Sequence, residues 1–286
     1  MKTPASAMAS AATAHDLRQT VEGWRANGET IALVPTMGAL HAGHLALVGE
    51  ALRRCRRTVV SIFVNPTQFS ADEDYDIYPR DLARDREMLA RLGADLLYVP
   101  SLAEMYPDGF ATEVRVAGIS DGLCAIQRPH HFSGVATVVA KLLNQCRPHI
   151  ALFGEKDYQQ LLVIRRLARD LDLDVQIVGV PTVRESDGLA LSSRNVALSP
   201  VGRTVAGRLN GALKEVARRM VAGEAVADAL VWGRGELISL GFEAVDYLEL
   251  RHGENLVPLD QATGPARLLV AVHIDGCCLI DNIALE

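Results

Sequence analysis

The chain has 286 residues, of which 49% are hydrophobic and 22% charged, a globular composition that excludes a disordered or fibrous protein. The net charge of -6 argues against a broad nucleic-acid surface, which needs clustered lysine and arginine, but it permits a local basic pocket. The five cysteines are odd in number and form no Cys-x-x-Cys pair, so we expect a reducing cytoplasm and no disulfide framework. No apolar run approaches the roughly 20 residues that cross a bilayer.

The N-terminal segment combines an alanine- and serine-rich stretch with the start of the first predicted helix. Residues up to about 12 lack the apolar core of a signal peptide, and we expect them to form a frayed extension. Leu17, Val21 and Trp24 then follow at helical spacing after Thr13, a suitable capping residue. We expect Gly28 to end this helix.

Short apolar runs alternate with helical patterns over residues 31–180. A continuous apolar run such as Ile31–Val34 is typical of a strand covered on both faces. Strands alternating with helices predict an α/β fold, a doubly wound parallel sheet of Rossmann-like type, in which ligands bind beyond the carboxyl ends of the strands. The predicted strands are 31–34, 58–64, 95–99, 150–153 and 175–180, and the predicted helices are 45–55, 82–92, 135–144 and 160–171.

The pattern changes after residue 182. Ser199-Pro200 is a good helix start, a second helix is expected over 226–240, and strands are expected at 245–250 and 268–274. We therefore predict two domains: a Rossmann-like domain over 1–182 and a smaller α+β lid domain over 183–286.

The segment His41-Ala42-Gly43-His44 lies at a predicted strand-to-helix junction. A helix start offers unpaired N–H groups and a positive dipole to an anion, and Gly38 and Gly43 allow close backbone approach. Two imidazoles can donate hydrogen bonds to phosphate oxygens and stabilise charge as pyrophosphate leaves. Taken alone, the motif is equally compatible with two ordinary histidines at a helix start.

Polar segments follow the other predicted strands. Asn65 and Gln68 suit recognition of hydroxyls and a carboxylate, although Asn-Pro is also a common turn. Lys156 and Arg194 suit phosphate, and the hydroxyls of Ser192 and Ser193 would complete a clamp at the domain junction. Local sequence alone leaves each of these segments open to being a solvated loop. The same applies to Arg128-Pro129-His130-His131-Phe132, whose arginine and histidines are the types that contact substrate or phosphate.

Five longer segments, together with the closing Leu279-Ile280-Asp281-Asn282, closely resemble the pantothenate synthetase (pantoate–β-alanine ligase) family. Their order and spacing match from about residue 31 to residue 195, and the His-x-Gly-His core is shared with a wider nucleotidyltransferase superfamily. The segments are residues 35–44, 63–69, 78–80, 153–160 and 187–195.

The resemblance implies an AMP-forming ligase of two steps. Pantoate's carboxylate attacks the α-phosphorus of ATP, and the amine of β-alanine then displaces AMP from pantoyl adenylate, leaving pantothenate. It also implies magnesium and a homodimer. The net charge and the lack of a long apolar run lead us to expect no nucleic-acid partner and no membrane. The implied residues are His44, His41, Lys156 and Arg194 for catalysis; Met37, Gly38, Ala39, Leu40, His41, Ala42, Gly43, His44, Gly154, Glu155, Lys156, Asp157, Val183, Leu191, Ser192, Ser193 and Arg194 for ATP; and Gln68, Gln160, Asn65, Arg128 and His131 for pantoate and β-alanine.

We interpret His44, which the family assigns as a proton donor, as acting chiefly on phosphate, because a carboxylate nucleophile has no proton to lose near neutral pH. The sequence departs from the family at His130, where glycine is usual, and a histidine would be strained there if φ were positive. Cys277-Cys278 stands where a Thr-Arg pair is common. The metal ligands are not identified; Asp85 is a weak candidate that is equally compatible with a helix-surface charge.

Two other functions remain open. The same motif serves enzymes that transfer a nucleotidyl group to a phosphate acceptor, although Gln68 and Gln160 argue against this because a phosphate would call for arginine or lysine. The second alternative is a nucleotide-binding module without catalysis. The presence of four residues suited to catalysis argues against it; they are His41, His44, Lys156 and Arg194.

Overall fold

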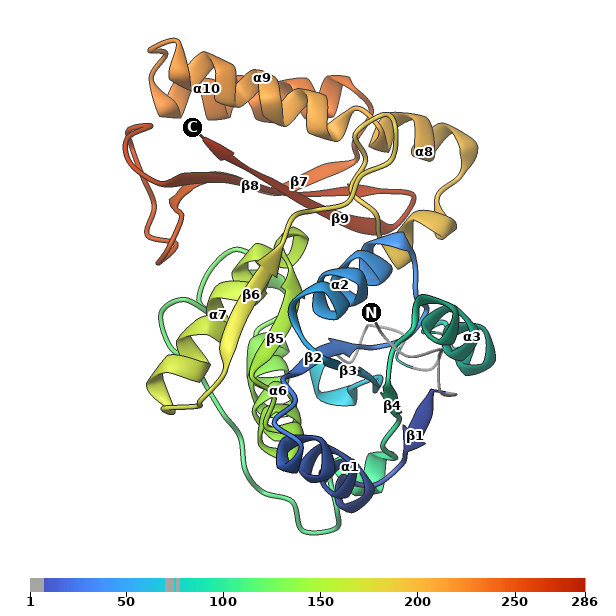
Figure 1. Ribbon diagram of the computed structural model, residues 1–286. Helices are drawn as coiled ribbons and strands as arrows, with labels where there is room; N and C mark the ends of the chain where they lie inside the picture. Colours follow the sequence, from blue (N-terminus) through green and yellow to red (C-terminus); the bar gives the residue numbers. More distant parts are fainter. Residues whose placement is uncertain (1–7, 70–74, 76–77, 286) are drawn as a thin grey trace. The chain divides into compact units, whose positions relative to one another are not determined.

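The computed structural model describes residues 8–69, 75 and 78–285 (Figure 1). The chain divides into two compact units. Met1–Glu155 and Val163–Pro181 form what we call the N-terminal unit, and Lys156–Leu162 and Thr182–Glu286 form the C-terminal unit. A domain boundary at residues 182 and 183 stays a prediction.

A parallel sheet forms the centre of the N-terminal unit. Within the described residues it has six strands in the order β1-β4-β3-β2-β5-β6, all parallel, which confirms the predicted doubly wound α/β fold (Figure 1). The chain order reverses between β2 and β5, so the sheet has its topological switch point there. The strands are β1 (Ala9–Ala11), β2 (Ile31–Thr36), β3 (Arg57–Ile62), β4 (Leu96–Tyr98), β5 (Ile150–Gly154) and β6 (Gln176–Val180).

The predicted frayed N-terminal extension is wrong for residues 9–11, which form the edge strand β1. Ala9 N–H donates to Asp95 O at 3.0 Å, and Val99 N–H donates to Ala11 O at 2.9 Å. These are backbone bonds, which side-chain composition does not reveal, because alanine and serine supply the same N–H and C=O groups as β-branched residues. Residues 1–7 lie outside the described part of the chain.

Helices cover both faces of this sheet. On one face, apolar residues of α2 and α3, such as Val48 and Leu89, pack with strand residues such as Val34 and Leu152. The predicted Thr13 cap is confirmed, because its Oγ1 accepts from Asp16 N at 3.1 Å. The helices are α1 (Ala14–Ala26), α2 (Ala42–Arg54), α3 (Leu82–Leu92), α4 (Leu102–Met105), α5 (Cys124–Gln127), α6 (His131–Cys146) and α7 (Tyr158–Asp170), with 3-10 turns η1 (Pro66–Gln68) and η2 (Glu155–Asp157).

The C-terminal unit packs helices against an antiparallel sheet. Apolar residues of α9 and α10, such as Val216 and Leu237, cover the face that carries Leu268, Val270 and Val272 (Figure 1). Across its described residues the sheet has the order β7-β8-β9. The elements are η3 (Ser193–Ala197), α8 (Pro200–Ala206), α9 (Leu209–Val221), α10 (Val226–Ser239), β7 (Ala244–His252), β8 (Ala266–Ile274) and β9 (Cys277–Leu285).

Strand β9 was not among the predicted strands. It follows β8 through Asp275 and Gly276, whose φ angles of +50° and +69° have the sign of a type I′ hairpin turn. An Asp-Gly pair between two apolar runs is a strong hairpin signal, so the sequence did contain the information. In the described part of the chain, no helix combines the length and apolar character that a membrane span requires.

Candidate active site

The loop from β2 to α2 carries the His-x-Gly-His motif at the switch point. Gly38 and Ala39 both have positive φ, +83° and +50°, and this turn leads the chain from the sheet into the helix. A side chain at Gly38 would place its Cβ 3.1 Å from both Ile62 Cγ2 and Asp85 Oδ2, so the turn favours glycine for space as well as for conformation.

The two histidines cap α2 reciprocally. Gly43 N–H donates to His41 Nδ1 at 3.1 Å, and His41 N–H donates to His44 Nδ1 at 3.3 Å. Because each Nδ1 accepts, the neutral imidazoles carry their proton on Nε2. The ring centroids are 4.1 Å apart. The helix start therefore presents two Nε2–H donors side by side without requiring either ring to be charged.

Asp85 supports this loop from α3. Its Oδ2 accepts from Ala39 N at 2.9 Å, its Oδ1 accepts from Leu40 N at 2.9 Å, and the residue is 2% exposed. Both oxygens are thus committed to the backbone of the motif, and a carboxylate satisfied in this way holds the turn rigid. This position favours a positioning role over the helix-surface charge that the sequence allowed.

Asp85→Asn is expected to lower the rate of ATP activation by about 100-fold. The amide keeps one acceptor but turns an NH2 towards a backbone N–H, and each hydrogen bond to a charged group contributes about 1.5–3 kcal/mol. The measurement is pyrophosphate release under saturating substrates. Asp81→Asn is the matched control, because Asp81 caps the same helix and asparagine caps equally well. Equal rates in the two variants would contradict the role.

A second polar cluster follows β3. Asn65 is 0% exposed, and its side chain accepts from Thr67 N at 3.4 Å and donates to Gly134 O at 3.1 Å and to Gln68 Oε1 at 3.0 Å. These partners orient Gln68 with its amide oxygen towards Asn65 and its NH2 away from it. Asn65 is therefore a positioning residue, and Gln68 offers two donors that suit a carboxylate or hydroxyl.

The hydroxyl of Tyr106 donates to Asn65 Oδ1 at 2.8 Å. Burial raises the pKa of Tyr106, so the phenol stays neutral and keeps this donor. Asn65, Gln68 and Tyr106 thus form a set of neutral side chains that are joined by hydrogen bonds.

Arg128 and His131 meet at the backbone of Gln68. Arg128 Nη2 donates to Gln68 O at 3.1 Å, and His131 Nδ1 lies 2.9 Å from the same oxygen. Since a carbonyl can only accept, His131 carries its proton on Nδ1, the opposite tautomer to His41 and His44. The strain considered for His130 is absent, because its φ is -96°. A histidine therefore adopts this backbone conformation without strain.

Gly134→Ala is expected to destabilise the N-terminal unit by roughly 1–3 kcal/mol. A Cβ at this position would lie 2.2 Å from Thr67 O, so α6 would be pushed away from η1. The measurement is the change in Tm. Gly49→Ala in α2 is the matched control, because nothing lies within 4 Å of its added Cβ and alanine favours the helix. A Gly134→Ala variant as stable as the control would contradict the close packing.

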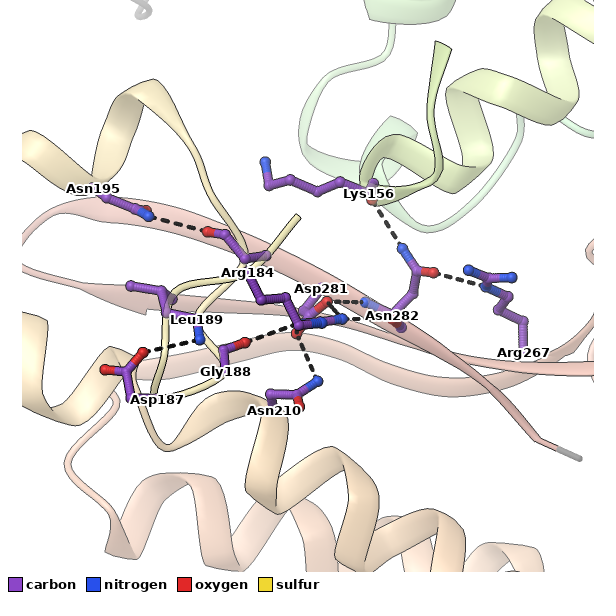
Figure 2. A network of polar contacts seen from close by, with 11 residues as sticks. Lys156, Arg184, Asp187, Gly188, Leu189, Asn195, Asn210, Arg267, Asp281 and Asn282 are labelled. Atoms are coloured by element: carbon purple, nitrogen blue, oxygen red, sulfur yellow. Dashed lines mark hydrogen bonds and ion pairs between the residues drawn. The ribbon is translucent and has the colours of Figure 1, made fainter. Parts of the chain in front are cut away.

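The C-terminal unit holds a second set of predicted residues on a polar network (Figure 2). Asn282, 3% exposed, donates from Nδ2 to Lys156 O at 2.9 Å and accepts from Arg267 Nε at 2.7 Å. The guanidinium of Arg267 in turn lies 3.9 Å from the ring centroid of Tyr158. Asn282 therefore holds the backbone at Lys156, and its position in β9 sets where the lysine side chain begins.

Asp281, the neighbour of Asn282 in β9, binds the segment that precedes Ser192. Its carboxylate pairs in a bidentate manner with Arg184, at 2.6 and 2.8 Å, and Arg184 also donates to Gly188 O at 3.0 Å (Figure 2). Residues 183–191 form a hairpin closed by Leu191 N to Val183 O at 3.0 Å. Asp281, in the middle of β9, therefore anchors this hairpin through Arg184.

The hairpin leads directly into the predicted phosphate clamp. Ser192 Oγ accepts from Arg194 N at 3.2 Å and so caps η3, and Asn195 Nδ2 donates to Ala190 O at 3.0 Å. At the hairpin tip Arg203 donates to Asp187 at 2.6 Å, and this bond holds the pKa of Asp187 below its usual range. Asp281, Asn282 and Arg184 were not predicted to have roles. For Asp281 and Asn282, the sequence signal was an acid and an amide set between apolar residues in the closing motif.

The predicted site residues divide between the units. Those at the helix start and around Gln68 belong to the N-terminal unit, as do Gly154, the last residue of β5, and Glu155. The remainder belong to the C-terminal unit, and their action on the same ligand stays a prediction; they are Lys156, Asp157, Gln160, Val183, Leu191, Ser192, Ser193 and Arg194.

A parallel sheet with a helix start and imidazole donors at its switch point defines the class of nucleotide-binding α/β proteins. The sequence model of the family described as Pantoate-beta-alanine ligase matches residues 9–284. The chain therefore belongs to the pantoate–β-alanine ligases, which form an amide bond.

Similar proteins agree with this assignment. The chain is 55% identical over 271 residues to the pantothenate synthetase of Rhodospirillum rubrum, covering 94% of this chain and 96% of that protein. The crystal structure of pantothenate synthetase from Thermus thermophilus matches with a TM-score of 0.92 and 48% identity, covering 98% of this chain and 100% of the other. The Francisella tularensis ligase, solved with Beta-gamma ATP and Beta-alanine, matches with a TM-score of 0.82 and 34% identity, and 98% of each chain is covered.

Proposed function

We propose that this protein condenses pantoate with β-alanine at the expense of ATP, by way of pantoyl adenylate. The observation that carries the proposal is the pair of Nε2–H donors of His41 and His44 at a helix start, held in place by Asp85. Family membership supports the identity of the acid and the amine.

In the first step a carboxylate oxygen of pantoate bonds to the α-phosphorus of ATP, and the bond to pyrophosphate breaks. The nucleophile is already ionised near neutral pH, so no base is required. The chain's contribution is to position the reactants and to stabilise the charge that develops on the phosphates. We assign the stabilisation of that phosphate charge to His41 and His44. Further donors are proposed to be Lys156, Ser192, Ser193 and Arg194.

In the second step the amine of β-alanine attacks the acyl carbon, AMP leaves, and the nitrogen loses a proton. The oriented NH2 of Gln68 is suited to hold pantoate, and Gln160 is proposed as a second amide on the same substrate. Asn65, Arg128 and His131 act on Gln68 by fixing its side chain and backbone.

We also propose that magnesium enters with ATP. Mg²⁺ is commonly held by substrate phosphates, waters and one or two carboxylates. Asp85 is not the carboxylate that we propose, because both of its oxygens already accept backbone N–H groups. Glu155 and Asp157, the two carboxylates within the predicted ATP segment from Gly154 to Asp157, are the ones that we propose for this role.

The test follows the two half-reactions separately. With ATP and pantoate alone, pyrophosphate should be released and pantoyl adenylate retained, and β-alanine should then release AMP and pantothenate. Pyrophosphate release only with a phosphate-bearing acceptor would replace the proposal with nucleotidyl transfer. Tight ATP binding without turnover under any of these conditions would indicate a binding module.

A cytoplasmic homodimer is the further expectation. The dimer rests on the family resemblance, and the location rests on the odd cysteine count without a disulfide framework. Light scattering coupled to size exclusion should give twice the 30.9 kDa of one chain. A mass equal to that of one chain would refute the dimer.

A further inference from the structure

Three potential metal ligands converge on one end of the C-terminal sheet, and the proposed reaction uses none of them. Asp246 lies on β7, His273 on β8 and Cys278 on β9. His273 and Cys278 are register partners, and the irregularity between Val245 and Tyr247 places Asp246 at a bulge beside them. The three ligand atoms lie within 4.8 Å of one another.

The cluster occupies the face of the sheet opposite the apolar core. Val272, Ile274 and Leu279, the neighbours of His273 and Cys278 in the chain, are buried in that core. Because side chains alternate along a strand, His273 and Cys278 project from the other face. The side chains of His273 and Asp246 are 34% and 17% exposed, so an ion from solvent can reach them while the strands hold them in place.

The contacts within the cluster converge on one oxygen. His273 Nε2 lies 2.8 Å from Asp246 Oδ2, and Cys278 Sγ lies 4.0 Å from the same oxygen. A protonated imidazole nitrogen and a thiol both donate to this carboxylate. A cation that replaces those protons would bond to one nitrogen, one oxygen and one sulfur.

We propose that Asp246, His273 and Cys278 bind a divalent transition metal of the zinc type. Imidazole, carboxylate and thiolate are the ligands that Zn²⁺ takes at about 2.0–2.3 Å, and three protein ligands leave a fourth tetrahedral position for water. The His273–Asp246 distance must widen by a few tenths of an ångström, which a rotation of the Asp246 carboxylate supplies. Mg²⁺ does not fit this set, because it prefers oxygen ligands.

The site is independent of the proposed synthesis of pantothenate. Binding displaces the thiol proton of Cys278 and frees Nε2 of His273 for the metal, so the affinity should fall as the pH is lowered. The bound ion would crosslink all three strands of the sheet and so stabilise the folded C-terminal unit.

In the experiment, the purified full-length protein is first freed of metal. It is then titrated with Co²⁺ and afterwards with Zn²⁺. Co²⁺ should produce a thiolate charge-transfer band that Zn²⁺ abolishes, and Zn²⁺ should raise the Tm. Cys278→Ser should lose the band, and Asp246→Asn and His273→Ala should weaken Zn²⁺ binding at least about tenfold.

Cys277→Ser is the matched control. The neighbouring thiol packs against the apolar core of the unit, so this variant should keep the band and the shift in Tm. A band that persists in Cys278→Ser, or no band in the wild-type protein, would overturn the proposal. Circular dichroism of each variant separates loss of the site from loss of the fold. Because the Asp246→Asn variant should still synthesise pantothenate at the wild-type rate, failure of either proposal is distinguishable from failure of the other.

Discussion

His44→Gln is expected to slow formation of pantoyl adenylate by about 100- to 1,000-fold, the usual loss when a donor to developing charge is removed. Glutamine at the third helical position can still reach back to the N–H of His41 and preserve the capping box. Its remaining NH2 group is then displaced from the position of the imidazole Nε2. The helix should therefore remain intact while the phosphate donor is lost.

The measurement separates the half-reactions. Pyrophosphate release from ATP and pantoate should fall, whereas amide formation from added pantoyl adenylate should be much less affected, because the departing AMP carries less charge than pyrophosphate. His130→Gln is the matched control, since this exposed histidine makes no side-chain cap bond and should change neither rate more than about twofold. If His44→Gln keeps near-full adenylation and loses only amide formation, the result would instead support a proton-donor role for His44.

Asp281→Ala is expected to cause the largest loss of stability, about 3 kcal/mol. The Asp281 side chain is 1% exposed and the Arg184 side chain 23%, so removal of the carboxylate leaves a largely buried guanidinium without its bidentate partner. The hairpin over 183–191 would loosen, and the predicted clamp from Ser192 to Arg194 with it. We therefore expect the KM for ATP to rise as well.

The two tryptophans allow the loss of stability in Asp281→Ala to be assigned to one unit. In a Trp24→Phe background, Trp232 is the single tryptophan and reports on the C-terminal unit during urea unfolding. Asp187→Ala is the matched control, because its ion pair with Arg203 has the same 2.6 Å length but side chains that are 36% and 41% exposed. Exposed pairs contribute roughly 0–1 kcal/mol. If both variants unfold at the same urea concentration, the buried pair is not the anchor of the hairpin.

Much of the fold follows from short-range patterns. The run Ile31–Val34 indicated a buried strand, and all four residues are 0% exposed in β2. Thr13 indicated a helix cap and accepts the expected hydrogen bond. The capping bond joins residues three apart, so its cause lies within a short window of sequence. The apolar run is also visible locally, although the strands that bury it, β3 and β5, lie far along the chain.

The supports of the site could not be predicted in this way. Asp85 bonds to a backbone 45 residues away, Arg184 pairs with a carboxylate 97 residues away, and Asn282 bonds to a carbonyl 126 residues away. No periodicity relates such partners. The same reason explains β1, whose pairing depends on backbone groups of a strand 87 residues further along.

The sequence by itself determined the class of sheet, the helix start at His41 and His44, and the family resemblance that connects the chain to pantoate and β-alanine. Anion binding at that helix start stays a prediction. Only the tertiary structure decided which atoms of that motif are donors, because the capping bonds assign the imidazole protons to Nε2. It also decided that Asp85 supports the loop and that Asp281 and Asn282 anchor the second set of residues. Residue types determine what chemistry is available, whereas burial and hydrogen-bond geometry determine which atom performs it.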